Sequence, residues 1–253
     1  MPLVSTPAIV LSAMRYGETS KIVRLATRDH GVQSAIAKGA LRPRSRFGAA
    51  LQLLSGGQAH LLLSERRDLH TLTAFDVVTI PVGLTGRVPC YATGVMLAEL
   101  MVRLVPADAH PESFDLLESS LVTLQQVTEA DVPAAALRSV WRLIASLGFQ
   151  PVLDRCARDG RELAADGDGA FSIADGGFLC AGCARGTEVL PLPRSAVDIL
   201  RQLLDPLVAL PLLDPRHAAA HRRLLSRYLR HHVGEGAPLP ALEFWGTHAW
   251  AAR

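Results

Sequence analysis

The sequence predicts an α+β chain of several domains: a small β-barrel or sandwich, then an all-helical domain interrupted by a short cysteine-bearing insert. Residues 1–80 read as short apolar stretches separated by turn signals, which is typical of a barrel or sandwich. Beyond about residue 90, the apolar spacing changes from two to about 3.6, the period of a helix. The insert, residues 153–186, is rich in Gly and Asp and poor in large apolar residues. A segment of this length without its own apolar core needs an additional cross-link to hold it together.

Residues 1–80 are predicted to form a series of strands. We expect strands near residues 7–13, 21–27, 32–37, 50–54, 58–63 and 69–76. The clearest turn is Asp29-His30-Gly31, where glycine provides the positive φ of a tight hairpin and aspartate can bond its own backbone. The run TIPVGLTGRVP has two prolines and two glycines and indicates a domain boundary. The predicted domains are therefore 1–80, 81–152, 153–186 and 187–253.

Three apolar stripes predict helices, and each stripe is interpreted as a face buried in the core. The stripes comprise Leu97, Leu100, Met101 and Leu104; Phe114, Leu117, Leu121 and Leu124; and Leu137, Val140, Trp141, Ile144 and Leu147. A fourth helix is expected from its N-cap Ser195 to Pro206. A last helix is expected over about 216–233.

Composition excludes several classes of protein. With 49% apolar and 20% charged residues, the 253-residue chain has the composition of a globular protein. The sequence has neither an apolar stretch of the length that a membrane span needs nor the features of a signal peptide at its start. We therefore expect a cytoplasmic, nucleoid-associated protein that does not contact the membrane. The sequence also lacks the motifs of a P-loop, a serine hydrolase, a zinc protease and a dinucleotide site, which predicts no nucleotide cofactor and no enzymatic activity.

The charge is uneven, because residues 1–80 carry ten lysines and arginines against five acids. Residues 30–64 contain Lys38, Arg42, Arg44 and Arg46 and no acid. If this segment were extended, the three arginines would point to one side and could neutralise phosphates. A solvated basic loop without a ligand is the alternative, which is weakened if the strands form a barrel of the oligonucleotide-binding (OB) kind. Stacking aromatics are scarce, since only Tyr16 and Phe47 lie nearby, so backbone electrostatics should dominate.

The insert contains a candidate zinc site. Cys180 and Cys183 form a C-x2-C knuckle, and Cys156 and Asp159 stand upstream in the order C-x2-D-x20-C-x2-C. This spacing is that of a zinc ribbon with a carboxylate in place of one thiolate. Two readings stay open: a zinc site, or buried thiols in an insert held by packing. A metal-dependent enzyme is disfavoured, because residues 153–186 contain no histidine that could act as a base.

The last predicted helix is basic, with Arg222, Arg223, Arg227 and Arg230 among its residues. A solvated face is the default interpretation. The alternatives are a second surface that binds DNA, or a site for an acidic protein tail whose carboxylate pairs with arginine while an apolar side chain enters a pocket.

The N-terminal stretch AIVLSAMRYGETSKIVRLATRDHGVQSAIAKGALRPRSRFGAALQ resembles the signature of the bacterial recombination protein O (RecO) family. The resemblance is strong over about the first 75 residues and looser, in the right order, over the remainder. The residues that carry it are Arg15, Gly17-Glu18, Thr27, Gly31, Ala37-Lys38-Gly39-Ala40 and Arg44-Ser45-Arg46-Phe47-Gly48.

This resemblance implies an N-terminal OB-fold, a helical C-terminal domain and, in many members, a zinc-ribbon-like insert. It implies a protein that binds single- and double-stranded DNA, anneals strands coated by single-stranded DNA-binding protein, and helps load the RecA recombinase together with recombination protein R. Lys38, Arg42, Arg44 and Arg46 would line the DNA surface, with Lys21 and Arg24 as further candidates. The helical domain would receive the C-terminal tail of single-stranded DNA-binding protein. Asp159 departs from the zinc-bearing members, which have a cysteine there.

We therefore expect a non-enzymatic DNA-binding and annealing protein of recombinational repair. The alternative is a protein–protein adaptor that uses the OB-fold as a scaffold and does not bind DNA strongly.

Overall fold

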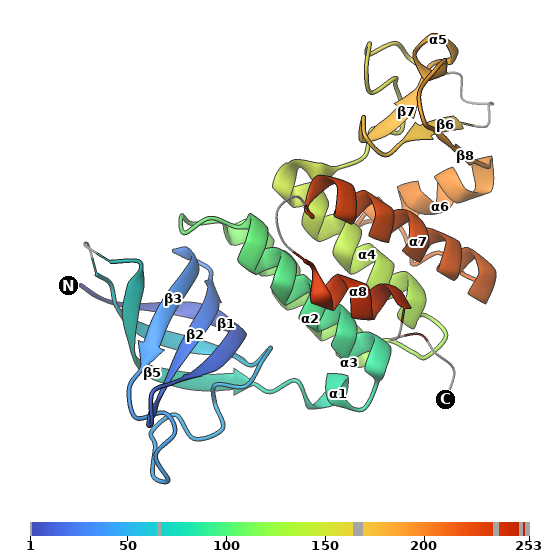
Figure 1. Ribbon diagram of the computed structural model, residues 1–253. Coiled ribbons are helices and arrows are strands. Elements are labelled where there is room, and N and C mark those ends of the chain that lie inside the picture. Colours follow the sequence, from blue (N-terminus) through green and yellow to red (C-terminus); the bar gives the residue numbers. More distant parts are fainter. Residues whose placement is uncertain (1, 65–66, 164–168, 235–237, 248–249, 251–253) are drawn as a thin grey trace. The chain divides into compact units, whose positions relative to one another are not determined.

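The computed structural model describes residues 2–64, 67–163, 169–234, 238–247 and 250. Its backbone falls into two compact units, Met1–Gln126 and Val127–Arg253, which are described separately below (Figure 1). Among the described residues, none of the helices has the length and apolar character to cross a membrane. The predicted domain boundaries at residues 80, 152 and 186 stay a prediction.

The first unit begins with a closed five-stranded barrel (Figure 1). Its strands are β1 (Leu3–Tyr16), β2 (Ser20–Thr27), β3 (Gly31–Ala37), β4 (Gly56–Leu62) and β5 (Leu69–Thr79). Around the barrel they follow the order β1-β2-β3-β5-β4 and then return to β1. All neighbours are antiparallel except β3 and β5, which are parallel. This five-stranded closure is that of an OB-fold, which confirms the expected fold class.

The length of β1 allows the barrel to close. Residues Leu3 to Ile9 pair with β4, while Ala8 to Tyr16 pair with β2, so one strand serves both neighbours. A register shift between Val10 and Ser12 bends β1 where it passes from one partner to the other, as a β-bulge does. The interior is filled by small and branched side chains, among them Val10, Val23, Leu25, Ala35, Ala59, Leu61 and Leu72.

One predicted strand is wrong. Residues 50–54 form turns and bends instead of a strand, although Leu51 and Leu54 are buried. The apolar pattern in this segment therefore reports burial without regular pairing. Short apolar runs identify buried residues better than they identify the backbone conformation.

The predicted hairpin at Asp29-His30-Gly31 is confirmed, since Thr27 pairs with Gly31 across β2 and β3. Gly31 has a φ of +66°, and a Cβ at this position would collide with the carbonyl oxygens of Asp108 and Pro106. Only glycine permits this close approach of the backbone at residues 106–108. The carbonyl of Pro106 also accepts a hydrogen bond from the Val32 amide at 3.0 Å.

Three helices complete the first unit: α1 (Val82–Thr85), α2 (Val88–Leu104) and α3 (Pro111–Gln126). The predicted stripe of α3 is confirmed, because Phe114, Leu117, Leu121 and Leu124 are all buried. In α2, Leu97, Leu100 and Met101 are buried as expected. Helix α1 and the start of α2 lie within the predicted boundary run, residues 79–89, and the barrel and the three helices belong to one compact unit.

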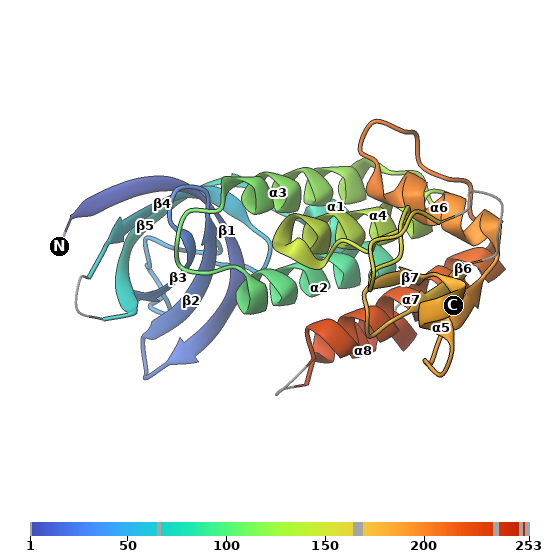
Figure 2. The same ribbon diagram turned by 90° about the horizontal axis from the view of Figure 1, so that it is seen from above.

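The second unit combines helices with a small sheet. Its elements are α4 (Val132–Ile144), η1 (Ala145–Phe149), β6 (Gly169–Ser172), β7 (Gly177–Leu179), α5 (Ala181–Ala184), β8 (Leu190–Leu192), α6 (Arg194–Leu204), α7 (Pro215–His232) and α8 (Pro240–Thr247). Helix α4 packs against α6 and α7 (Figure 2). The ring of Trp141 on α4 lies 5.3 Å from that of Tyr228 on α7.

The predicted N-cap Ser195 is wrong, because α6 begins at Arg194 with Pro193 as its N-cap. The Pro193 carbonyl accepts hydrogen bonds from the amides of Ala196 and Val197. Pro193 is extended (φ −64°, ψ 151°), so the helix starts after it, two residues before Ser195 could act as the cap.

Helix α7 contains a buried histidine. His221 is 3% exposed, and within the described part of the chain neither of its ring nitrogens has a hydrogen-bond partner. Burial, assisted by the nearby His217, lowers the pKa of His221 from 6.5 to about 4. The imidazole is therefore neutral in the folded protein at pH values where the unfolded chain already binds a proton.

We expect this difference in proton binding to make the second unit less stable in acid. As pH falls from 6.5 to about 4, the unfolded state takes up a proton that folded His221 does not, so the free energy of unfolding falls. Replacing His221 with leucine should reduce this fall by up to about 3 kcal/mol. Urea denaturation at pH 7 and pH 4.5 measures it, with exposed His231→Gln as the control. An equally steep fall in His221→Leu would contradict the assignment.

Candidate nucleic-acid interface and metal centre

The basic segment forms a loop between β3 and β4 that is anchored in the barrel. Phe47 and Leu51 are each 2% exposed and belong to the same core cluster as the strands. Arg42, Arg44 and Arg46, in contrast, are exposed. The loop thus has one apolar anchor and a cationic outer surface, and Phe47, proposed from sequence as a nearby stacking aromatic, is a core residue.

Consecutive turns shape this loop. The amides of Arg42, Ser45 and Gly48 bond to carbonyls three residues earlier, at 3.0 to 3.1 Å. The segment is therefore not extended, and the spacing of two does not by itself align the arginines. The Leu41 amide bonds to the Thr19 carbonyl at 2.8 Å, so the loop is held against the turn between β1 and β2.

Two further cations lie at this end of the barrel. Arg15 and Lys21 are direct cross-strand partners, and Lys21 also pairs with Ala37, the residue before Lys38. Like charges placed directly opposite each other in a sheet are destabilising. An anion bound between them would remove that cost. Sequence reasoning missed Arg15 as a site residue because only the strand register reveals its pairing with Lys21.

Arg24 lies on the other face of β2. Residues 21, 23 and 25 alternate with residues 22, 24 and 26, and Val23 and Leu25 belong to the barrel core. Arg24 therefore points outward, where its Nε donates to Ser34 Oγ at 3.3 Å. The structure groups Lys21 and Lys38 at the loop and separates Arg24 from them.

The four candidate metal ligands come together in the insert. One ligand atom from each of Cys156, Asp159, Cys180 and Cys183 lies within 4.8 Å of the others, so the cluster could hold a metal ion. Cys156 and Cys180 are buried and Cys183 is partly exposed. Residues separated by some twenty positions in sequence are thus neighbours in the fold.

The spacing of these atoms fits a tetrahedral ion. Asp159 Oδ2 lies 3.3 Å from Cys180 Sγ and 3.4 Å from Cys183 Sγ. Two ligands at ordinary zinc–sulfur and zinc–oxygen distances in a tetrahedron are separated by about 3.6 Å. The donor set, three thiols and one carboxylate, also consists of groups that zinc accepts.

The short distances between these side chains also shift the pKa values of Cys183 and Asp159. The hydrogen bond with the Cys180 thiol, partial burial and the Asp159 carboxylate raise the pKa of Cys183 to about 12. Hydrogen bonds from the Cys156 thiol and from the Arg161 amide hold the pKa of Asp159 well below its usual range. Without a cation, then, the group is one carboxylate that accepts hydrogen bonds from thiols.

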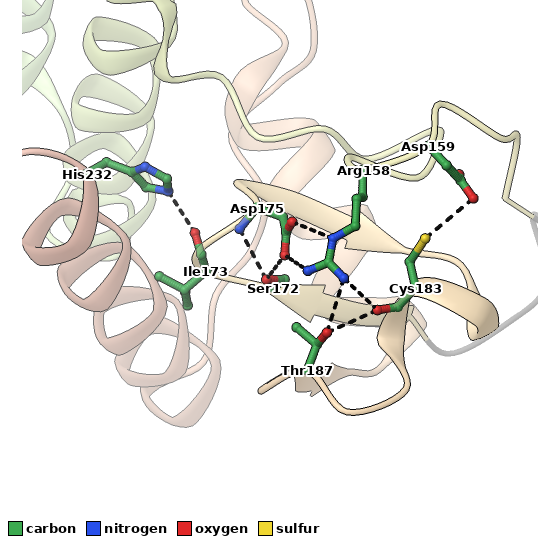
Figure 3. A network of polar contacts seen from close by, with 8 residues as sticks. All are labelled: Arg158, Asp159, Ser172, Ile173, Asp175, Cys183, Thr187 and His232. Carbon is green, nitrogen blue, oxygen red and sulfur yellow. Dashed lines mark hydrogen bonds and ion pairs between the residues drawn. The ribbon is translucent and has the colours of Figure 1, made fainter.

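Arg158 connects the two halves of this cluster (Figure 3). It stands between Cys156 and Asp159 in sequence, and its Nη1 donates to the Cys183 carbonyl at 3.1 Å. Its Nε and Nη2 bond both carboxylate oxygens of Asp175 at 3.0 and 2.9 Å. Ser172 and Asp175 are in turn hydrogen-bonded through side chain and backbone. A bidentate charged pair of this kind fixes orientation as well as distance.

The insert is also attached to α7. His232 Nε2 bonds to the Ile173 carbonyl at 2.7 Å, as Figure 3 shows, and the Tyr228 ring lies 6.3 Å from that of Phe171 on β6. Strand β8 lies beyond residue 186 and pairs with β6, so the sheet of the insert extends past the predicted segment.

The arginines of α7 have different surroundings. Arg227 pairs with Glu188 at 3.3 Å, and Arg230 forms two bonds with Glu243, the shorter at 2.9 Å. Arg222 lies over the Trp250 ring at 4.5 Å from its centroid, and burial lowers its pKa. Arg223 is exposed. The helix thus carries a basic face that is partly neutralised by acids of the same unit.

A groove of ≈ 400 Å³ lies between the insert and α7. Its lining combines apolar and charged side chains: Ile173, Ala174, Glu188, Leu190, Arg227, Arg230 and His231. Such a groove can receive an apolar side chain beside a carboxylate, which is the chemistry expected of a tail-binding site.

Comparison with known proteins agrees with this architecture. Residues 1–81 match the family model described as the N-terminal part of recombination protein O, and residues 90–242 match that of its C-terminal part. The "DNA repair protein RecO" of Anaeromyxobacter sp. (strain K) is 34% identical over 244 residues, which cover 92% of this chain and 93% of the relative. The protein of that name from Rubrobacter xylanophilus is 32% identical over 241 residues and 94% of each chain.

A closed barrel of this strand order, in a chain that also has helices and a small sheet flanked by the cysteine cluster, defines an OB-fold protein with a ribbon-like insert. Within that class, the two matched models together cover most of the sequence. The chain belongs to the recombination protein O family.

Proposed function

We propose that this chain acts in DNA repair as a DNA-binding protein that holds strands by their phosphates and anneals them. The observation that carries the proposal is the cationic end of the barrel, where Lys38, Arg42, Arg44 and Arg46 lie on a loop anchored by Phe47. Arg15 and Lys21 add a like-charged pair beside it. Membership of a family whose relatives are named DNA repair proteins supports the same conclusion.

The mechanism needs no catalytic step. Guanidinium and ammonium groups replace the counterions of the DNA backbone, and their release supplies affinity that does not depend on sequence. A protein that also binds a second ligand raises the local concentration of complementary strands. We infer that this ligand is the tail of single-stranded DNA-binding protein, and that the chain works with recombination protein R in loading the recombinase on coated DNA.

The loop prediction is tested by changing Arg42, Arg44 and Arg46 together to alanine. If each contacts one phosphate, the slope of log binding constant against log salt should flatten by about 2 for a single strand. Affinity should fall by a similar factor for all sequences, because phosphates carry no base information. Fluorescence anisotropy of labelled single-stranded and duplex oligonucleotides at several salt concentrations measures both effects.

The charge-matched control replaces Arg185, Arg194 and Arg216, exposed arginines of the second unit, with alanine. An equal change of slope in this control would assign the effect to net charge. An unchanged slope in the loop variant would remove the loop from the DNA surface.

We propose that the metal cluster binds zinc in a structural role. Cys156, Asp159, Cys180 and Cys183 would hold the ion, which, when bound, staples a segment too small to form a core of its own. Their mutual distances and donor types support zinc, and the four protein ligands leave no position for a substrate.

We expect about one zinc per chain after purification under reducing conditions, measured by elemental analysis. Cys180→Ser should lose the metal, and Asp159→Cys should keep it and release it to a chelator more slowly, because a fourth thiolate completes the commonest structural set. Cys90→Ala is the control, since Cys90 is buried in α2 and lies outside the cluster. Zinc-free wild-type protein would contradict the proposal.

We propose that the groove beside α7 binds the acidic tail of single-stranded DNA-binding protein. Arg227 and Arg230 would exchange their partners Glu188 and Glu243 for carboxylates of the tail, while Ile173 and Leu190 contact its apolar residues. Arg223 and Arg222 would extend the basic surface along the helix.

Charge reversal at Arg227 should weaken binding of a labelled tail peptide at least about tenfold, because an attraction becomes a repulsion at the groove. Arg223→Glu should have a smaller effect. Arg216→Glu is the control, since it lies eleven residues earlier, about 16 Å along the helix. Retained peptide binding with reduced oligonucleotide binding would instead make α7 a second DNA surface, and no effect on either would make it a solvated face.

A further inference from the structure

The register of the barrel strands defines a second surface, on the outer face of β1, β2 and β3. Directly paired residues in neighbouring strands point to the same side of a sheet. Val23, Ala35 and Ala37 belong to the barrel core, so the residues that alternate with them point outward. The outward rows are Tyr16 with Ser20; Met14 with Ile22 and Ile36; and Ser12 with Arg24 and Ser34.

These rows carry an unusual combination of exposed side chains. Met14 is 60% exposed and Tyr16 is 53% exposed, at the end of a hairpin whose tip residues are solvent-accessible. Ile22 and Ile36 are partly exposed beside Met14. The third row adds Arg24, whose hydrogen bond to Ser34 holds its guanidinium along the sheet surface. An aromatic ring, an apolar strip and a cation thus follow one another over about 13 Å.

Tyr16 is also distinct from the other aromatic residues of the barrel. Among the barrel residues that the structure describes, Phe47 and Phe75 are buried, and Tyr16 has the one exposed ring. Folding gains nothing from leaving an aromatic ring exposed to water, so the exposure of Tyr16 does not stabilise the barrel. Exposed rings near cations are the groups on which unpaired bases stack, because every base has a π-face.

The charges around this surface favour a polyanion over a protein partner. Arg24 is the cation on this face, and the acid nearest to the rows in sequence is Glu18, in the adjoining turn. An apolar protein surface would be matched by the middle row alone and would leave the charge of Arg24 without a counter-ion. A single strand of nucleic acid matches both, since its bases are apolar on their faces and its phosphates are anionic.

We propose that the outer face of β1, β2 and β3 binds the unpaired bases of single-stranded DNA, with Tyr16 as the stacking residue. Met14, Ile22 and Ile36 form the apolar strip next to it, and Arg24 contacts a phosphate. The inference rests on the proposed function, that the chain binds DNA, and adds a surface separate from the arginine loop. Arg15 and Lys21, which alternate with the outward residues, belong to the loop side.

This arrangement assigns different ligands to the two surfaces. The arginine loop contacts phosphates, which single strands and duplexes both present. The outer face contacts base faces, which are covered by stacking in a duplex. The specificity for single strands therefore resides in Tyr16 and its apolar neighbours, and the salt dependence resides in the loop.

The test compares Tyr16→Ala with Tyr16→Phe on three labelled probes of equal length: an oligothymidine, an abasic strand and a duplex. Tyr16→Ala should weaken binding of the oligothymidine roughly 5- to 150-fold, the range for loss of one stacked base. Binding of the abasic strand and the duplex should stay within about twofold, and the salt slope should not change. Tyr16→Phe should bind like the wild type, because it keeps the ring.

Leu3→Ala is the matched control, an exposed apolar residue at the other end of β1. Equal losses on all three probes, or full binding of oligothymidine by Tyr16→Ala, would overturn the inference while leaving the proposed function intact. A wild-type protein that binds none of the probes would overturn both. As an independent readout, photocrosslinking to an iodouracil-substituted strand should modify Tyr16, and modification confined to other residues would contradict the assignment.

Discussion

The burial of Phe47 in the barrel is the interaction on which the proposed nucleic-acid surface depends. The loop between β3 and β4 has no regular secondary structure, and a segment of this kind would otherwise sample many conformations. Phe47 and Leu51 bring two points of it into the core, and the Leu41 amide bonds it to the turn before β2. Arg42, Arg44 and Arg46 lie between Leu41 and Phe47, so they are held at one end of the barrel even though their side chains are exposed.

A similar principle operates in the insert, with polar groups in place of a core. The segment has few large apolar residues, and its buried cluster is essentially Cys156, Leu179 and Cys180. Arg158 compensates by connecting the two knuckles through Asp175 and the Cys183 carbonyl. Asp175 is 18% exposed and Arg158 is 45% exposed, so the carboxylate is the less solvated end of this pair. The ligand positions are thereby brought together by the fold itself, and a metal would reinforce an arrangement that already exists.

Much of the fold could be predicted because its signals are local. Alternation within strands, the Gly31 turn and the stripe of α3 each depend on residues within one element. The errors arise where the backbone conformation depends on another segment of the chain. Leu51 and Leu54 are buried like strand residues, but their segment pairs with no strand. Ser195 does not cap α6 because the helix already begins at Arg194, with Pro193 as its N-cap.

The candidate sites show the same division. The C-x2-C spacing and the run of basic residues are visible in sequence, and the structure brings the four metal ligands together. The pairing of Arg15 with Lys21, the outward position of Arg24 and the acids beside Arg227 and Arg230 depend on strand register and helix packing. These contacts join residues that sequence spacing cannot relate, so no periodicity could have revealed them.

Two surfaces on one barrel would also account for how an annealing protein releases its product. A purely electrostatic clamp binds a duplex at least as well as its separate strands, because pairing leaves the phosphates in place. A surface that contacts base faces behaves in the opposite way, since its ligand disappears when the bases pair. If Tyr16 contributes part of the affinity for a single strand, annealing removes that part, so the duplex is bound less tightly than its separate strands, while the free energy of base pairing drives the annealing itself. Pairing would thus weaken the hold on the product without nucleotide hydrolysis, and the arginine loop would remain the contact with the duplex.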